Sequence, residues 1–240
     1  MALALATAGW EVIVTGRTER TLRETAAAAA DRAAAAGSGE ASGGGGRVEL
    51  AVLDVADGAE VRKFFGGLER IDVLVNNAGT GAPAAPVQEV SEEDWRRVVD
   101  TNLTGAFLCA QAAFALMLRQ DPKGGRIINN GSISAQVPRP HGIAYTASKH
   151  AVSGLTKGLE LEGRAHGITA CQIDIGNAAT AMTARMPAGV LQADGTVAIE
   201  PTIDVEHVAQ AVLYMANLPL DVSVPFMTVM ATGMPFMGRG

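Results

Sequence analysis

Tyr145 and Lys149 form a Tyr-x-x-x-Lys pair whose residue types could carry out acid-base chemistry. Because residues i and i+4 share one face of a helix, we expect the phenol and the ammonium to lie close together. A neighbouring positive charge favours the phenolate and lowers a pKa by roughly 1–3 units, here from the ~10 of free tyrosine. The pair therefore predicts that Tyr145 donates or accepts a proton near neutral pH. The spacing alone is also typical of an ordinary helix-surface pair.

Further polar residues follow predicted strands or lie in a predicted helix. Ser132 comes after the apolar stretch 126–129, the run Asn76-Asn77-Ala78-Gly79 follows an earlier apolar stretch, and Asn102 lies in a long helical stretch. Each by itself is typical of a strand-end turn or a helix cap, and Asn and Gly favour turns. Together with Tyr145 they indicate a single functional constellation.

The elements that position these residues follow from the hydrophobic pattern, in which apolar strands alternate with amphipathic helices. Regular alternation predicts an α/β fold, a Rossmann-like doubly wound parallel sheet with helices on both faces, in one domain over residues 1–240. The pattern Asp57-x-x-Glu60 predicts a capping box at a helix start. The predicted strands span residues 12–14, 48–52, 71–75, 126–129, 168–173 and 226–230, and the predicted helices span 18–36, 91–119, 142–165 and 204–217.

Composition excludes several classes of function. The net charge is −6 without a basic block, and aromatic residues make up 4%, so we expect no nucleic-acid partner. No apolar run approaches the ~20 residues of a membrane span, and we expect no membrane partner. Cys109 and Cys171 lie in apolar runs and are expected to be buried free thiols, which indicates a reducing, cytoplasmic location and no metal site. Residues 37–46 are Gly- and Ser-rich and predict a flexible linker.

The combination of Asn-Asn-Ala-Gly after a strand, Ser132, and Tyr-x-x-x-Lys resembles the short-chain dehydrogenase/reductase family, over nearly the whole chain from about residue 9. The resemblance implies that Tyr145 exchanges a proton with the substrate oxygen and that Ser132 hydrogen-bonds the same oxygen. It implies that Lys149 lowers the pKa of Tyr145 and binds the nicotinamide ribose. It also implies that the backbone of Asn102 holds a water of a proton relay.

The same resemblance implies where the dinucleotide would bind. Asp54 and Val55 would contact the adenine, and Asn76, Ala78 and Gly79 would pack on the adenosine side. After residues 168–173 the family usually has Asn-Pro-Gly, whereas this chain has Asp174-Ile175-Gly176. Gly176, Ala178 and Thr180 would still meet the nicotinamide amide. The family builds its substrate lid over the stretch that corresponds to residues 181–201.

The choice of cofactor depends on the residues after the strand at 12–14. NAD enzymes usually place an acid there that bonds the ribose hydroxyls, whereas this chain has Gly16 followed by Arg17. Since a guanidinium can pair with a 2′-phosphate, Arg17 predicts NADP(H) as the cofactor. The alternative is that Arg17 is a solvated charge at a helix start.

The chain departs from the family at its beginning, because residues 1–10 resemble the later part of the first helix. The family's first strand and glycine-rich turn are expected to be missing, as in a truncated gene model or isoform. Without this strand the fold would lose about four buried aliphatic side chains, each of which contributes roughly 1.5–3 kcal/mol. The total loss would rival the ~5–15 kcal/mol stability of a whole domain. In the family this first strand lies between the strands that correspond to residues 12–14 and 71–75. Backbone N–H and C=O groups of both would therefore lack hydrogen-bond partners.

The expected function is NADP(H)-dependent hydride transfer between the nicotinamide and a carbonyl or secondary alcohol of a small molecule, in a homodimer or homotetramer. The alternative is a truncated, catalytically impaired cofactor-sensing or scaffold protein. A sugar-nucleotide epimerase would need additional C-terminal length.

Overall fold

The structure is a computed structural model that describes residues 1–36, 46–180, 183 and 188–237. The predicted linker at 37–46 therefore lies outside the described residues except for its last position. Part of the predicted lid at 181–201 lies outside them as well.

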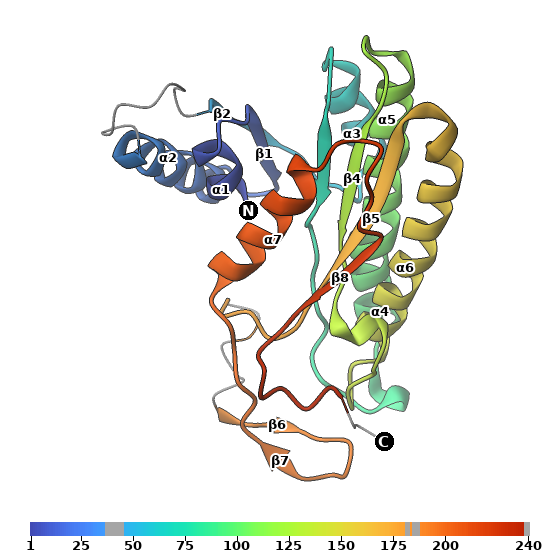
Figure 1. Cartoon of the computed structure of the whole chain (residues 1–240). Helices are drawn as coiled ribbons and strands as arrows, with labels where there is room; N and C mark the ends of the chain where they lie inside the picture. Colours follow the sequence, from blue (N-terminus) through green and yellow to red (C-terminus); the bar gives the residue numbers. More distant parts are fainter. Residues whose placement is uncertain (37–45, 181–182, 184–187, 238–240) are drawn as a thin grey trace.

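Helices and strands alternate along the chain as the sequence predicts (Figure 1). The strands are β1 (Val12–Gly16), β2 (Val48–Val52), β3 (Val73–Asn76), β4 (Gly125–Asn130), β5 (Ile168–Ile175), β6 (Val190–Leu191), β7 (Val197–Ala198) and β8 (Phe226–Val229). The helices are α1 (Ala2–Thr7), α2 (Glu19–Ala36), α3 (Gly58–Gly66), α4 (Glu92–Val99), α5 (Gly105–Arg119), α6 (Ile143–Gly163) and α7 (Val205–Asn217).

The main strands are parallel, which confirms the predicted α/β fold. β3, β4, β5 and β8 form one sheet in that order, and β1 pairs with β2. β6 and β7, within the predicted lid, form a small antiparallel pair. Since the carboxyl ends of parallel strands lie at one edge, the segments after β3, β4 and β5 are brought together there.

Helices cover both faces of the sheet, and adjacent strand residues point to opposite sides. Ile127 packs with α3 and α5 in one core, whereas Ile128 packs with α7 in the other. Cys109 and Cys171 are free and buried, as predicted, one in each core. Burial raises the pKa of both thiols to about 11, so both are protonated at neutral pH.

Helix caps locate the helix starts. Asp57 accepts hydrogen bonds from the backbone of Ala59 and Glu60, and Asp204 caps α7 in the same manner. The predicted capping box at Asp57 is only half correct. The Glu60 carboxylate accepts from the N–H of Asp54 at 2.9 Å, so it fixes the end of β2 instead of the helix start.

The helical stretch Glu92–Arg119 is, by length and composition alone, apolar enough to cross a membrane, which the sequence prediction did not recognise. In the structure α5, the later part of this stretch, packs against the sheet. Cys109, Ala110 and Met117 of α5 lie in the same core as Ile127 of β4.

The described residues place no strand between β1 and β3, and these two strands share no ladder. The N–H of Val12 donates to the carbonyl of Arg47, just before β2. The carbonyl of Asp72, just before β3, accepts from the N–H of Arg126 in β4. Because alternate residues of a parallel strand face opposite neighbours, Ile13 and Thr15 of β1 direct their N–H and C=O groups away from β2, and Val73 and Val75 of β3 direct theirs away from β4. A cavity lies between the two edges.

Both cores contribute walls to this space. Leu5 of α1 and Val208 of α7 line it from one core, and Phe65 of α3 and Cys109 of α5 line it from the other. The cavity between β1 and β3 therefore has apolar walls and unpaired backbone groups on both sides, as a site for one further buried parallel strand would have.

We predict that an extended apolar segment joined ahead of Met1, which lines the cavity, stabilises the fold. Each buried aliphatic side chain contributes about 1.5–3 kcal/mol, and ordering the backbone opposes this by ~1–2 kcal/mol per residue. The expected net gain is on the order of a few kcal/mol, measured as a higher denaturant midpoint. A Gly/Ser segment of equal length is the control, and equal midpoints for both fusions would contradict the prediction.

Candidate active site

One cavity of about 1480 Å³ runs along the carboxyl ends of the strands and continues between β1 and β3. Its volume exceeds the ~300–1,000 Å³ of most small-molecule sites because it includes this gap. Every predicted site residue except Asn102 lines it, namely Arg17, Asp54, Val55, Asn76, Ala78, Gly79, Ser132, Tyr145, Lys149, Gly176, Ala178 and Thr180. Among the described residues, no group of three or more His, Cys, Asp or Glu side chains could hold a metal ion.

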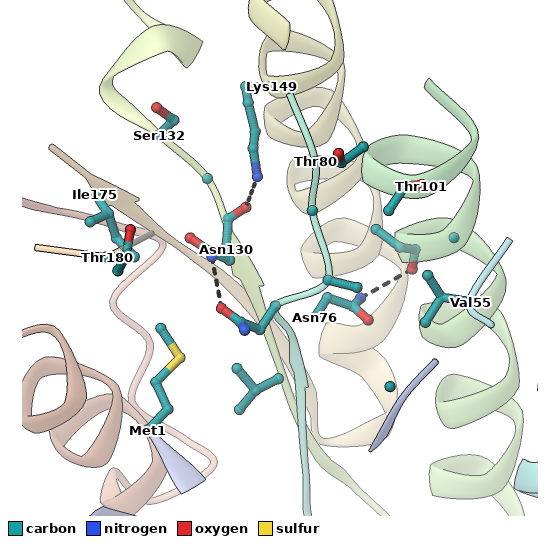
Figure 2. A pocket seen from close by; sticks show the side chains of 18 of the residues that line it. Met1, Val55, Asn76, Thr80, Thr101, Asn130, Ser132, Lys149, Ile175 and Thr180 are labelled. Carbon is teal, nitrogen blue, oxygen red and sulfur yellow. Dashed lines mark hydrogen bonds between the residues drawn. The ribbon is translucent and has the colours of Figure 1, made fainter. Parts of the chain in front are cut away.

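Tyr145 and Lys149 lie one turn apart on α6, and Ser132 follows β4. The Lys149 Nζ lies 5.6 Å from the centroid of the Tyr145 ring. It donates to the carbonyl oxygen of Asn130 at 2.6 Å, and Figure 2 shows the lysine reaching this carbonyl. Ser132 and Lys149 are both buried. The structure therefore brings the predicted proton-transfer residues into one enclosed place.

The pKa of Tyr145 differs from the sequence prediction, which had Lys149 lowering it. Burial raises the pKa of Tyr145 above its ordinary value of 10.0, and the negative charge of Asp174 adds to this. A hydrogen bond with Ser132 and the charge of Arg139 act in the opposite direction. Burial outweighs the neighbouring charges, so the phenol keeps its proton at neutral pH.

Lys149 is affected by the same burial. Burial lowers the pKa of its ammonium from 10.5 to about 8, and the charge of Asp174 partly opposes this. Near neutral pH the ammonium is mostly charged but can release its proton far more readily than an exposed lysine.

Asn102 lies behind the cavity wall and acts on it through neighbours. It belongs to a π-helical stretch, Asp100–Thr104, that joins α4 to α5. Its side chain accepts from the N–H of Thr80 at 2.8 Å and donates to the carbonyl of Thr80 and to the hydroxyl of Ser148. Asn102 thus fixes the segment after β3 against α6, and its predicted water contact stays a prediction.

The residues predicted to hold the 2′-phosphate and the adenosine lie at or just after the ends of β1, β2 and β3. Arg17 is exposed after β1, and within the part of the chain that the structure describes its guanidinium forms no ion pair. Val55 packs closely on the start of α5, since a Cβ on Gly105 would lie 2.7 Å from its side chain. The Asn76 amide bonds to the Ala106 carbonyl and to Asn129, so this side chain is rigidly held.

The loop after β5 is packed closely although it lacks the proline. A Cβ on Gly176 would lie 2.6 Å from the Met230 side chain, so only glycine fits this position. Ala178 is buried and bridges to Ile203, whereas Thr180 is exposed at the cavity. Ile175 also lines the cavity, and Figure 2 labels it together with Thr180.

Sequence reasoning did not identify Asn130 or the contact between Arg139 and Glu200. Arg139 lines the cavity and bonds to the buried Glu200 at 2.5 Å. Burial by itself raises the pKa of Glu200, but hydrogen bonds from Asn177, Gln192 and Arg139 lower it overall. This pair ties the loop before α6 to the segment after β7. Its partners are far apart in the sequence, and nothing in their spacing indicates the contact.

Comparisons with known proteins show which family the chain is similar to. The family described as short chain dehydrogenase matches residues 1–190. Sulfoacetaldehyde reductase 2 of Chromohalobacter salexigens is 32% identical over 95% of this chain and 86% of that protein. Galactitol 2-dehydrogenase of Rhizobium johnstonii is 34% identical over 89% of this chain and 81% of that protein. A solved structure of actinorhodin polyketide ketoreductase with NADPH is 28% identical with a TM-score of 0.80, over 95% of this chain and 89% of that one.

We predict that Lys149→Met stabilises the protein near neutral pH. Between pH 8 and 10.5 the unfolded chain holds a proton on Lys149 that the folded chain has released, so stability rises with pH in this window. Below pH 8 the folded state holds a buried charge. The lowered pKa corresponds to ~3 kcal/mol of destabilisation of the folded state by the charged ammonium. Loss of the hydrogen bond to Asn130 in the variant offsets about 1 kcal/mol of the gain.

The expected gain is therefore about 2 kcal/mol at pH 7, declining as the pH rises from 8 toward 10, measured by denaturant titration at each pH. Lys157→Met, at an exposed position on the same helix, is the control and should show no such decline. A constant or negative difference for Lys149→Met would contradict the direction of the pKa.

Proposed function

Because the chain belongs to the short-chain dehydrogenase family, whose members are NAD(P)-dependent oxidoreductases, we propose that it transfers a hydride between NADP(H) and the carbonyl or secondary alcohol of a small molecule. The observation that carries the proposal is the meeting of Ser132, Tyr145 and Lys149 in one cavity, with Arg17 lining the same cavity. The substrate oxygen would bind near Ser132 and Tyr145, and the 2′-phosphate of the cofactor would bind near Arg17.

In the reductive direction Tyr145 gives its proton to the substrate oxygen while the carbonyl carbon gains a hydride. When bound, the reduced nicotinamide supplies that hydride. The raised pKa of Tyr145 keeps the proton on the phenol at neutral pH, which is the state that a donor needs. The Ser132 hydroxyl bonds the same substrate oxygen and holds it in place.

Lys149 and Asn102 support this step from behind. The Lys149 ammonium lies within reach of the ring and would stabilise the phenolate left after proton transfer. Lys149 would also bind the nicotinamide ribose. The backbone of Asn102 would hold the water through which Tyr145 regains its proton.

The residues around the rest of the cavity fit a dinucleotide. Asp54 and Val55 would contact the adenine, and Asn76, Ala78 and Gly79 would lie along the adenosine. Gly176, Ala178 and Thr180 would meet the nicotinamide amide. All of them come from the carboxyl ends of parallel strands, where such folds bind their ligands. Arg17, exposed and without an ion pair among the described residues, would bind a 2′-phosphate.

We further propose a cytoplasmic homodimer or homotetramer that packs through α5 and α6, and a substrate lid over residues 181–201. Phe107 on α5 and Leu161 on α6 are exposed at 44% and 66%, and the proposed interface would cover both side chains. A cofactor-sensing or scaffold protein remains the alternative, because β1 and β3 do not share a continuous sheet.

We predict that Tyr145→Phe lowers kcat by at least about 100-fold in carbonyl reduction, because the proton donor is lost. NADPH binding should stay close to that of the parent protein. The measurement is NADPH absorbance with a panel of ketones and aldehydes, together with a fluorescence titration of NADPH. Tyr214→Phe replaces the other tyrosine of the chain, which is 54% exposed on α7, and is the control. Full turnover by Tyr145→Phe would refute the role of Tyr145, whereas unchanged cellular function of a variant without turnover would favour the scaffold function.

We predict that Arg17→Ala reduces the preference for NADPH over NADH by about 10-fold or more, since a charge-assisted bond to the 2′-phosphate contributes about 1.5–3 kcal/mol. The measurement is kcat/KM for each nicotinamide. Arg20→Ala removes an exposed arginine that pairs with Glu24 and should leave the ratio unchanged. A parent protein that prefers NADH would refute the role of Arg17.

A further inference from the structure

Asp174 is a buried carboxylate in the last part of β5 and has no role in the proton transfer proposed above. Its exposed fraction is 1%, and within the described residues it forms no salt bridge. A buried carboxylate without a cationic partner has a large desolvation cost and is uncommon unless it accepts several hydrogen bonds. The position of Asp174 therefore calls for an explanation.

Three donors hold this carboxylate. Its Oδ1 accepts from the backbone N–H of Ser132 at 3.0 Å and from the amide of Gln172 at 2.7 Å. Its Oδ2 accepts from the amide of Gln136 at 2.8 Å. Both oxygens are thus fixed, and one of them fixes the backbone of the residue whose hydroxyl would grip the substrate.

The end of β4 leaves room for this carboxylate. A Cβ on Gly131 would lie 2.1 Å from Asp174 Oδ1 and 2.6 Å from the Gln172 amide nitrogen. Only glycine therefore allows the strand end and the carboxylate to approach so closely. The hydroxyl of Ser132 also accepts from the N–H of Ser134 at 3.1 Å, so backbone and side chain of Ser132 are held together.

We propose that Asp174 is a positioning residue of the active site, which holds the backbone of Ser132 and keeps a fixed negative charge beside Tyr145 and Lys149. This inference rests on the proposed function and adds a residue to it. Asp174 touches neither the substrate oxygen nor the hydride in this role. It acts through the residues that do.

The charges that face Tyr145 come from three elements. Lys149 lies on α6, Arg139 lies on the loop before α6, and Asp174 lies on β5. The charge of Asp174 raises the pKa of Tyr145 and also that of Lys149, whereas Arg139 lowers the pKa of Tyr145. Asp174 therefore keeps the proton on the donor and keeps the ammonium charged, and both states are needed for carbonyl reduction.

The first test is a direct titration that needs no cofactor. In a Tyr214→Phe background Tyr145 is the remaining tyrosine, so a ¹³C-tyrosine NMR signal reports its proton alone. Asp174→Asn keeps the shape of the side chain and removes its charge, and Gln136 can turn its amide to bond the new NH₂ group. The tyrosine signal should titrate at lower pH in Asp174→Asn than in the background protein. An unchanged or higher midpoint would refute the electrostatic role.

The second test separates charge from position by kinetics with NADPH and a carbonyl substrate. In Asp174→Asn the alkaline limb of the kcat profile should move to lower pH, because Tyr145 and Lys149 both lose protons earlier. In Asp174→Ala, which leaves the N–H of Ser132 without its acceptor, kcat should fall by up to about 100-fold with a smaller change in KM for NADPH. A kcat close to that of the parent protein in Asp174→Asn but not in Asp174→Ala would support the proposal that residue 174 positions Ser132.

Asp204→Asn is the matched control, because asparagine caps a helix as well as aspartate does and α7 should be unaffected. It should leave the pH profile and the tyrosine titration unchanged. Both Asp174→Asn and Asp174→Ala remove the negative charge. The tyrosine titration of either folded variant therefore tests whether that charge acts on Tyr145. An unaltered kcat in Asp174→Ala would refute the positioning role. If the parent protein reduces no carbonyl with NADPH, the proposed function fails, while the NMR titration still decides whether Asp174 acts on Tyr145.

Discussion

The contact between the Lys149 ammonium and the carbonyl oxygen of Asn130 joins α6 to the carboxyl end of β4, and the site depends on this junction. β4 is buried along almost its whole length between β3 and β5, so its end is a fixed point of the fold. Because Lys149 is held there, the ring of Tyr145 one turn earlier on α6 faces the segment that carries Ser132. Two secondary structure elements thereby determine the geometry of three functional side chains.

Burial gives this arrangement its chemistry and also its energetic cost. The ammonium of Lys149 and the carboxylate of Asp174 are both nearly inaccessible, and neither forms a direct ion pair with the other. In a low-dielectric interior their charges act on Tyr145 more strongly than surface charges would. An apolar replacement of either side chain is expected to relieve desolvation while it removes the electrostatic control of the proton, which is the usual conflict between stability and activity.

Much of the fold could be predicted because its signals are local. The predicted strands at 126–129 and 168–173 lie within β4 and β5 of the structure. The polar residues that follow them lie at the edge of the sheet that forms the site. The direction of the Tyr145 pKa could not be predicted, since it depends on how deeply the ring is buried and not on the spacing to Lys149. Asp174 was visible as an acid at the end of an apolar run, but its contact with Ser132 joins strands that are distant in sequence.

The cavity between β1 and β3 links the stability of the sheet to the binding of the cofactor. Arg17 stands at the end of β1 and Lys149 lies against the end of β4, so a dinucleotide that reached both would connect the two parts of the sheet. Any ligand that binds only when these parts are correctly placed stabilises that placement by mass action. Conversely, disorder of β1 relative to β3 would lower the apparent affinity by the fraction of molecules that are not competent to bind. Cofactor affinity and fold stability should therefore change together in variants that alter this gap, whereas Ser132 and Asp174, held within the continuous part of the sheet, should be affected much less.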